Sequence, residues 1–346
     1  MNKLFLPILV ACAISCTSNK NSDSASVYGV EFPDSVEMTW NYLAGDGYVP
    51  SSYRSIVADD SCVYVLGLSR GHWVHIFNTH TGLYQGMHVL RGDGVGLLEN
   101  PSSIRICKGG TGFSVYDHKS DFTTNVKCYS SNFEFQRTLT LDSLFRVVNG
   151  IYDLSPGRAV VTAPVFEENK RPTHRSAICI VDTEAKKVLS SYDGKESSDT
   201  LLASIYRVIS IAPSCNRVAT VQNYGGALEI YRISGDSICR TFVKNYFPVD
   251  YIYYEGREFP EINREIQYGF RWVAATDDYI YASYCDSKEV QPLVTTIGVW
   301  DWDGNPVKKI KTDRNIWNMA ASPDGRRLYC ISPVAGTSPQ LCYIDL

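Results

Sequence analysis

Residues 319–330 read MAASPDGRRLYC, and this stretch decides the fold. An apolar run that ends in small residues meets the turn Ser322-Pro323-Asp324-Gly325, and a second apolar run follows. Proline fixes φ and glycine accepts positive φ, so this turn is preset between two strands. Related hairpin patterns recur at residues 56–65, 211–220 and 273–282, which predicts a repeated β-module.

A second pattern completes each module with an apolar stretch, a polar turn and another apolar stretch. It is clearest at 73–82 (WVHIFNTHTG), 228–236 (LEIYRISGD) and 298–304 (GVWDWDG). Four short strands per module make one twisted blade, and a ring of blades buries the faces that a single blade leaves open. Module starts are spaced by roughly 50 residues, as in propeller blades. They fall near Ala58, Ile106, Leu154, Ala212, Ala275 and Ala321.

The last copy of the tail, CYIDL at residues 342–346, leaves the sixth module with three strands. We expect its outer strand to come from Val36–Trp40, which alternates in polarity. The predicted fold is therefore all-β: a six-bladed β-propeller over residues 30–346, with the last blade closed by an N-terminal strand. A two-domain β-sandwich protein is the alternative. A membrane barrel would need strands of about 10 alternating residues, longer than these runs.

Composition narrows the classes of partner. The chain has 346 residues, 44% of them hydrophobic and 20% charged, with a formal net charge of -4. This balance is typical of a soluble globular domain and shows no basic excess for nucleic-acid binding.

The N-terminus has the pattern of an export signal. Lys3 precedes the apolar run Leu4–Ile14, which is shorter than the ~20 residues of a membrane helix. The following Ser15-Cys16 resembles a bacterial lipobox. We expect a lipoprotein signal peptide at residues 1–15, lipidation at Cys16 and a flexible tether at 16–29. The expected location is the outer membrane, on its periplasmic or cell-surface side, with the lipid as the only membrane contact. An ordinary secretory signal is the alternative.

The chain contains 11 cysteines, of which nine remain beyond Cys12 and Cys16. No Cys-x-x-Cys pair occurs, so zinc and thioredoxin-like sites have little support. Most of the nine suit buried positions in strands, and a disulfide between Cys330 and Cys342 stays open.

An aromatic residue followed by arginine precedes several inner strands. Segments that lead into inner strands gather at one mouth of a propeller channel, so their guanidinium groups predict an electropositive rim for an anionic ligand. The alternative is that each arginine pairs with a nearby acid or carbonyl and links blades. The candidate ligand-binding residues are Arg54, Arg146, Arg207, Arg271, Arg314, Tyr53, Tyr206 and Phe270.

Other motifs favour structural roles. Gly92-x-Gly94-x-Gly96 lacks the following helix of a phosphate loop and suits a linker between blades. Of the clustered histidines His72, His75, His80 and His88, the first two lie at odd spacing, hence on opposite strand faces, and His80 lies in a turn, so unrelated surface and core roles are expected rather than a metal site. The acid pairs at 59–60, 277–278 and 301/303 suit turns better than calcium. We expect no catalytic motif, metal or cofactor.

Two longer segments interrupt the regular spacing. Residues 165–175 are polar, whereas residues 245–268 are rich in tyrosine and phenylalanine. Exposed aromatic rings would suit a glycan or a protein partner from the envelope, and the alternative is that these rings cover a blade edge.

The chain resembles the TolB-like six-bladed propeller lipoproteins of Bacteroidetes over about residues 30–346. The resemblance is carried by 299–309 (VWDWDGNPVKK), 322–329 (SPDGRRLY) and 277–281 (DDYIY). Residues 91–101 (RGDGVGLLENP) are similar to the glycine-rich linker of NHL-type propellers. The resemblance implies a propeller anchored in the cell envelope and transfers no catalytic residues.

Together these features predict a lipid-anchored propeller that acts as a non-catalytic binding module. Its expected partner is a glycan, an anionic small molecule or an envelope protein. The alternative is a metal-dependent propeller hydrolase or lactonase, which predicts acids and asparagines converging on the channel axis. A purely structural partner of an outer-membrane complex would instead expose a large apolar patch.

Overall fold

The computed structural model describes most of the chain beyond residue 29. The described ranges are 30–43, 50, 52–107, 112–119, 124–140, 150–166, 172–192, 207–212, 214–222, 226–246, 251–254, 257–260, 269–285, 293–333 and 339–346. Within them, only the backbone is described for 124, 164–166, 172–176, 207–208, 251–254 and 257–260.

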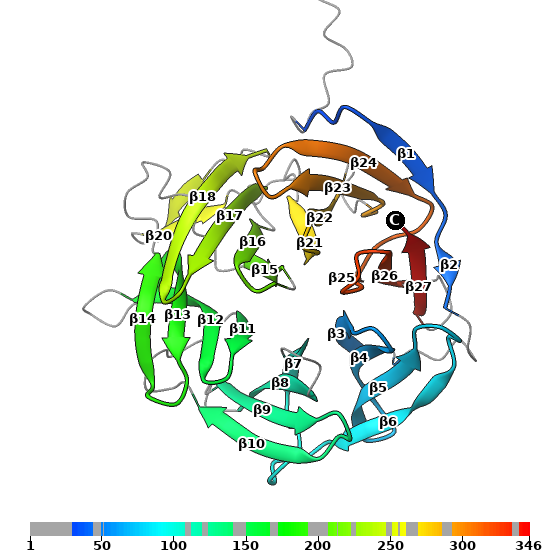
Figure 1. Ribbon diagram of the computed structural model, residues 1–346, viewed down its shortest axis with the longest axis vertical. Coiled ribbons are helices and arrows are strands. Elements are labelled where there is room, and N and C mark those ends of the chain that lie inside the picture. The colour runs from blue at the N-terminus through cyan, green and yellow to red at the C-terminus, as the bar shows by residue number, and fades with distance from the viewer. Residues whose placement is uncertain are drawn as a thin grey trace, which may run out of the picture.

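Six four-stranded antiparallel blades form a ring, which confirms the predicted propeller (Figure 1). The blades comprise, in chain order, β3 (Ser52–Ala58), β4 (Cys62–Ser69), β5 (His72–Asn78) and β6 (Tyr84–Leu90); β7 (Pro101–Ile106), β8 (Gly112–His118), β9 (Thr124–Ser130) and β10 (Phe135–Thr140); β11 (Gly150–Ser155), β12 (Arg158–Phe166), β13 (Pro172–Asp182) and β14 (Lys187–Tyr192); β15 (Arg207–Ile211), β16 (Arg217–Gln222), β17 (Ala227–Ser234) and β18 (Ser237–Asn245); β21 (Phe270–Ala275), β22 (Tyr279–Tyr284), β23 (Thr296–Asp301) and β24 (Pro306–Thr312); and β25 (Asn318–Ala321), β26 (Arg327–Ser332), β27 (Gln340–Asp345) and β2 (Asn41–Tyr42).

The innermost strands β3, β7, β11, β15, β21 and β25 surround the centre of the ring (Figure 1). The first five blades are meanders that start at the inner strand and end at the outer strand, and β25, β26 and β27 follow the same order in the sixth blade, so all six inner strands begin at the same mouth of the channel. We call this the strand-start mouth and the opposite one the strand-end mouth. No described residue is in a helix long and apolar enough to cross a membrane.

The predicted closure by an N-terminal strand is confirmed, but its position was wrong. The strand that completes the sixth blade is β2, in which Asn41 pairs with Tyr343 and Tyr42 with Cys342. The preceding β1 (Ser35–Met38) instead pairs in parallel with β24 as a fifth strand of the fifth blade. An alternating strand suits the edge of either blade, so polarity alone could not choose between them.

The turns follow the chemistry expected from the sequence. Ser322 Oγ donates a hydrogen bond to Asp324 Oδ1 at 2.6 Å, and the Gly325 amide donates to the Ser322 carbonyl at 3.0 Å. Gly325 has φ +71°, a conformation that costs glycine little. The turn at Ser322–Gly325 is therefore locally encoded.

The linker at residues 91–100 is held by a buried ion pair. Lys127 Nζ lies 3.0 Å from Asp117 Oδ2, and Asp117 Oδ1 accepts hydrogen bonds from the backbone amides of Glu99 and Asn100 at 2.9 and 2.8 Å. Lys127 also donates to the Leu97 carbonyl. The predicted blade-to-blade linker is thus positioned by the second blade itself.

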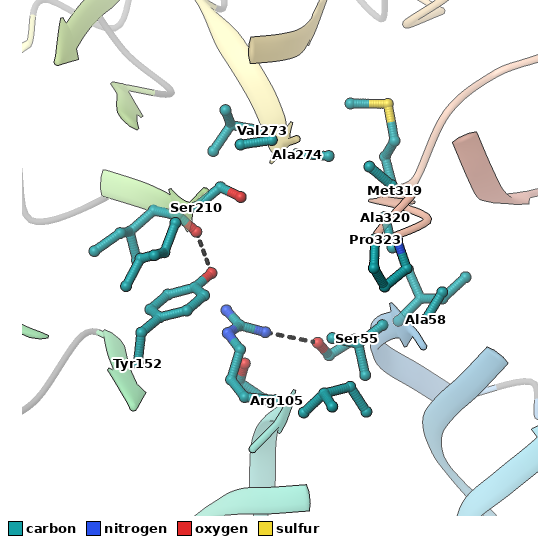
Figure 2. A pocket seen from close by; sticks show the side chains of 18 of the residues that line it. Ser55, Ala58, Arg105, Tyr152, Ser210, Val273, Ala274, Met319, Ala320 and Pro323 are labelled. Atoms are coloured by element: carbon teal, nitrogen blue, oxygen red, sulfur yellow. Dashed lines mark hydrogen bonds between the residues drawn. The ribbon is translucent and has the colours of Figure 1, made fainter. Parts of the chain in front are cut away.

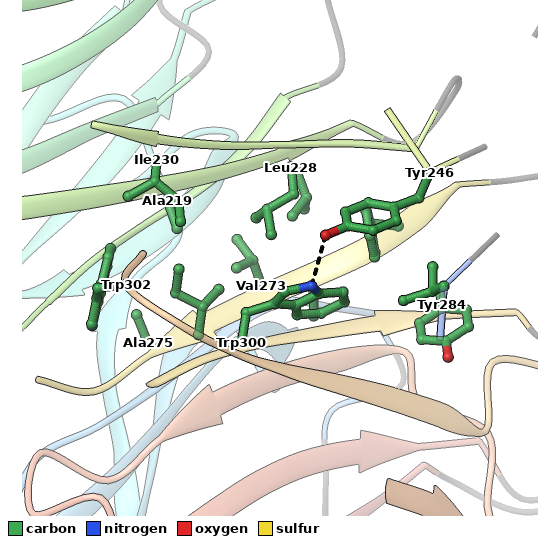
Figure 3. Packing of buried hydrophobic residues seen from close by; sticks show 14 of the residues in the cluster. Ala219, Leu228, Ile230, Tyr246, Val273, Ala275, Tyr284, Trp300 and Trp302 are labelled. Carbon is green, nitrogen blue, oxygen red and sulfur yellow. Dashed lines mark hydrogen bonds between the residues drawn. The ribbon is translucent and has the colours of Figure 1, made fainter. Parts of the chain in front are cut away.

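The hydrophobic core lies mainly between neighbouring blades. In the cluster between the fourth and fifth blades, the Trp300 indole nitrogen donates to the Tyr246 hydroxyl at 3.0 Å (Figure 3). The Trp300 ring covers Gly298 so closely that an added Cβ would lie 2.3 Å from it. Burial of these large rings fixes how adjacent blades meet, and so fixes the channel.

Candidate functional site

A cavity of about 640 Å³ occupies the central channel. All six inner strands line it, so it exists only in the assembled ring (Figure 2). Most of the side chains in its wall are small or aliphatic, and a few are polar. One lining residue from each blade is Ser55, Arg105, Tyr152, Ser210, Ala274 and Ala320.

Arg105 is a half-buried cation in this wall. Its Nη1 donates to the Ile104 carbonyl at 2.7 Å and reaches Ser55 Oγ at 3.4 Å (Figure 2). Its Nε is buried without a hydrogen-bond acceptor. Within the described part of the chain, no carboxylate forms an ion pair with Arg105. Its positive charge therefore faces the cavity without a direct ion pair among these residues, although the side chains of Asp59, Asp60 and Asp153 belong to the same cavity wall.

Tyr152 holds the guanidinium group of Arg105 in place. The guanidinium carbon lies 4.5 Å from the centre of the Tyr152 ring, a cation–π contact. The Tyr152 hydroxyl donates to the Ile209 carbonyl of β15 (Figure 2). Burial raises the pKa of Tyr152, although the positive charge of Arg105 opposes this change. The phenol therefore stays neutral at ordinary pH. The ring thus acts as a fixed platform between blades.

The strand-end mouth carries acids and thiols. Burial raises the pKa of Asp153, although a hydrogen bond from Cys107 and the charge of Arg137 oppose this change. Burial, followed by the negative charge of Asp153, raises the pKa of Cys107 to about 12. Cys107 is therefore a protonated thiol at neutral pH and lacks the thiolate that a nucleophile needs.

Among the predicted rim residues, Arg54 lines the cavity and also links two blades. Its Nη1 donates to Asn100 Oδ1 at 2.6 Å and to the Pro101 carbonyl at 2.8 Å. Its guanidinium carbon lies 5.1 Å from the centre of the Trp73 ring. These contacts match the alternative of an arginine that connects blades, while the residue remains exposed.

The other predicted residues do not gather in the described cavity wall. Arg314 lies over the Tyr42 ring at 4.1 Å and donates to Gln340 Oε1 at 3.2 Å, beside the closing strand. Arg271 is half-buried in β21. Phe270 is fully buried in the core between the fourth and fifth blades. Tyr53 stacks on Trp317.

Several predictions fall outside what is described. Arg146, Tyr206 and Cys16 lie outside the described residues, and Arg207 is described only by its backbone. An arginine rim that binds a ligand therefore stays a prediction. The aromatic segment at 245–268 contributes the hairpin β19 (Tyr251–Tyr254) and β20 (Arg257–Pro260), described by its backbone.

Sequence reasoning missed Arg105, although a signal was present. The residue just before each predicted module start occupies an equivalent place on an inner strand, and all six line the cavity. Four of them are apolar and two are charged. In chain order they are Val57, Arg105, Asp153, Ile211, Ala274 and Ala320.

The histidines and acid pairs have structural partners. His75 is buried between the Tyr84 hydroxyl and the Gly67 carbonyl, each 3.1 Å away. Asp59 accepts hydrogen bonds from the Ser61 and Cys62 amides within its turn. In the described ranges, no group of three or more His, Cys, Asp or Glu residues is placed to hold a metal ion.

Cys330 and Cys342 face each other across β26 and β27 as buried free thiols. Buried thiols are also present at Cys179 and Cys285, in line with the expectation of small buried hydrophobes, whereas Cys239 is exposed.

Solved structures with low sequence identity share this fold. A putative exported protein from Bacteroides fragilis NCTC 9343 aligns with a TM-score of 0.56 and 14% identity, covering 90% of this chain and 99% of the other. Regucalcin from Agrobacterium tumefaciens str. C58, a calcium-binding protein, aligns with a TM-score of 0.51 and 12% identity, covering 90% of this chain and 96% of the other. The WD40 repeats of RRP9 align with a TM-score of 0.52 and 11% identity, covering 91% of this chain and 99% of the other. At such identity these similarities show the fold alone.

No curated protein sequence matches the chain. The model of one family does match, over residues 32–324, which covers all or part of every blade. The six-bladed ring and this match lead to one assignment: the chain belongs to the TolB-like 6-blade propeller-like family.

Proposed function

We propose that this propeller is a non-catalytic binding module that holds a small anionic ligand in its central channel. The observation that carries the proposal is the Arg105 guanidinium, which lines a cavity of about 640 Å³ and whose Nε has no acceptor. A half-buried cation without a direct ion pair is costly, and a carboxylate or phosphate offsets this cost through charge-assisted hydrogen bonds.

The surroundings of Arg105 favour binding over mere structural pairing. Its contacts with Tyr152 and Ser55 fix the orientation of the guanidinium group before any ligand arrives. A preorganised group loses less conformational freedom on binding, which favours affinity. The cavity volume also falls within the roughly 300–1,000 Å³ of small-molecule sites.

Thermal unfolding of the purified protein tests the proposal. Citrate, glucuronate and inorganic phosphate are compared with glucose, using wild type, Arg105→Gln and Arg326→Gln. We expect at least one anion to stabilise wild type, by about 2.7 kcal/mol when it is present at 100 times its dissociation constant. Arg105→Gln should lose this effect. Arg326, whose side chain is 86% exposed and does not line the cavity, is the control for loss of one positive charge.

Two results would contradict this function. Stabilisation that persists in Arg105→Gln would remove Arg105 as the anchor. Stabilisation by calcium alone, with no response to any anion, would favour the metal-dependent hydrolase or lactonase instead.

The proposed setting is the outer membrane, with the propeller attached through lipid at Cys16. The apolar run Leu4–Ile14 and the following Ser15-Cys16 support this. An alkyne-labelled palmitate fed to expressing cells should label wild type and the Cys12→Ala variant, but not Cys16→Ala. The unlabelled variant should leave the membrane fraction. Equal labelling of all three, or of none, would instead favour an ordinary secretory signal.

A further inference from the structure

Aromatic rings lie where three neighbouring inner strands begin, at the strand-start mouth. Trp317 directly precedes β25, and its ring stacks on that of Tyr53 in β3, with 5.5 Å between centroids and 30° between planes. Trp272 in β21 is half-buried and lines the cavity. The rim therefore carries flat apolar surfaces on the fifth, sixth and first blades.

Trp317 differs from most tryptophans of this chain. It is 42% exposed, whereas Trp40, Trp73, Trp300 and Trp302 are each 5% exposed or less. The stack with Tyr53 holds the ring in place while much of it faces solvent. A rigid, exposed indole at the mouth of a pocket is a typical contact for the flat face of a ligand.

The polar part of the cavity wall points to a ligand with hydroxyl groups. Ser103 Oγ is buried without a hydrogen-bond partner and lines the cavity, as does Arg105 with its unpartnered Nε. The Ser210 side chain also lines it. An apolar acid, such as a fatty acid, would leave these groups unpaired, which is unfavourable. A polyhydroxylated ligand can pair with them.

The aromatic rings and the cation lie within reach of one ligand. Ser55, which contacts Arg105, is two residues beyond Tyr53 on β3. Even with the register shift between them, the backbone positions of Tyr53 and Ser55 are at most roughly 7 Å apart along β3. Trp272 lines the cavity together with Arg105, and Tyr53 and Trp317 are the chain neighbours of the lining residues Arg54 and Asn318. The cavity of about 640 Å³ is far larger than a single inorganic anion requires.

We infer that the ligand is an acidic sugar. Its pyranose ring packs the C–H groups of one face on the aromatic surface at the mouth, and its carboxylate or phosphate meets Arg105 in the channel. The ring hydroxyls exchange hydrogen bonds with the serines of the wall. This inference rests on the proposed function, because it takes Arg105 as the anion anchor.

Calorimetric titration with matched small molecules separates the acidic-sugar assignment from the simpler proposal of an anion site. Glucuronate carries ring, hydroxyls and carboxylate; glucose lacks the acid; cyclohexanecarboxylate lacks the hydroxyls. Glucose 6-phosphate distinguishes a phosphate from a carboxylate source of charge. We expect glucuronate or glucose 6-phosphate to bind at least tenfold more tightly than glucose and than cyclohexanecarboxylate.

Two exposed aromatic residues provide the variant and its control. Trp317→Ala should weaken binding of the acidic sugar by about fivefold or more while leaving the affinity for inorganic phosphate unchanged. Tyr279→Ala, which removes a 39% exposed ring from the turn side of β22, should change neither.

The outcomes are distinguishable. Equal affinity for glucuronate and cyclohexanecarboxylate, or an unchanged Trp317→Ala, would overturn the sugar assignment and leave an anion site. Failure of every anion to bind wild type would overturn both the sugar assignment and the proposed function. Tight binding of glucose equal to that of glucuronate would remove the acidic group from the assignment.

Discussion

At the scale of single residues, two ion pairs differ in how deeply their side chains are buried. Lys127 and Asp117 pair with side chains 7% and 1% exposed, and they hold the linker at 91–100. Arg158 and Asp236 pair with side chains 41% and 47% exposed. Removing one partner of a buried pair leaves an uncompensated charge, whereas water solvates the survivor of an exposed pair.

We therefore expect Lys127→Met to lower the free energy of unfolding by about 3–5 kcal/mol. Arg158→Met, the matched control on the surface, should change it by about 0–1 kcal/mol. Urea unfolding followed by tryptophan fluorescence measures both values. Equal losses in the two variants would show that burial does not decide the contribution of these pairs.

Asp153 gives a prediction about pH. Burial raises the pKa of Asp153 in the folded protein, whereas aspartates of an unfolded chain titrate at about pH 3.9. The folded state then binds the proton more tightly, so the contribution of this group is fully present below the unfolded pKa. It is lost as pH rises through the folded pKa.

The free energy of unfolding of wild type, relative to that of Asp153→Asn, should therefore fall as pH rises from about 4. Denaturant unfolding at a series of pH values gives this difference directly, because titration of the other acids affects both proteins alike. A difference that stays constant with pH, or that moves in favour of wild type, would contradict the raised pKa.

At the scale of elements, two N-terminal strands serve two different blades. β2 completes the sixth blade beside β27, while β1 adds a fifth strand to the fifth blade beside β24. Between them, the Trp40 amide donates to Asp313 Oδ1 at 2.9 Å, and the Trp40 ring is buried. This short segment covers strand edges that would otherwise be open to pairing with other chains.

A protein that starts at residue 44 lacks both strands, whereas one that starts at residue 30 keeps them. We expect the shorter form to unfold at a lower temperature and to associate, because β27 and β24 become unpaired edges. Differential scanning calorimetry and size-exclusion chromatography compare the two forms. Identical melting temperatures and monomeric behaviour would show that ring closure contributes little to stability.

The same elements show what local sequence can and cannot specify. The turn at Ser322–Gly325 was predictable because proline, aspartate and glycine act on their own backbone. The role of β1 was not, because the alternation of Val36 and Met38 fits either neighbouring blade edge. The choice depends on tertiary contacts such as the burial of Trp40.

At the scale of the whole molecule, the candidate site is a property of the ring. Arg105, Tyr152 and Ser55 come from three different blades and meet only where the inner strands converge. The arginines before the inner strands were visible as a local motif. Arg105 becomes conspicuous only when the six modules are superimposed, because a single strand offers nothing to compare it with.

The parallel pairing of β1 with β24 also has a mechanical consequence. The register runs from Ser35 opposite Lys309 to Met38 opposite Thr312, so a load applied along β1 acts parallel to both strands. Such a load shears several backbone hydrogen bonds together instead of peeling them one after another. A propeller suspended by its N-terminal chain would thus resist pulling at β1, before any force reached the closing strand β2 or the channel.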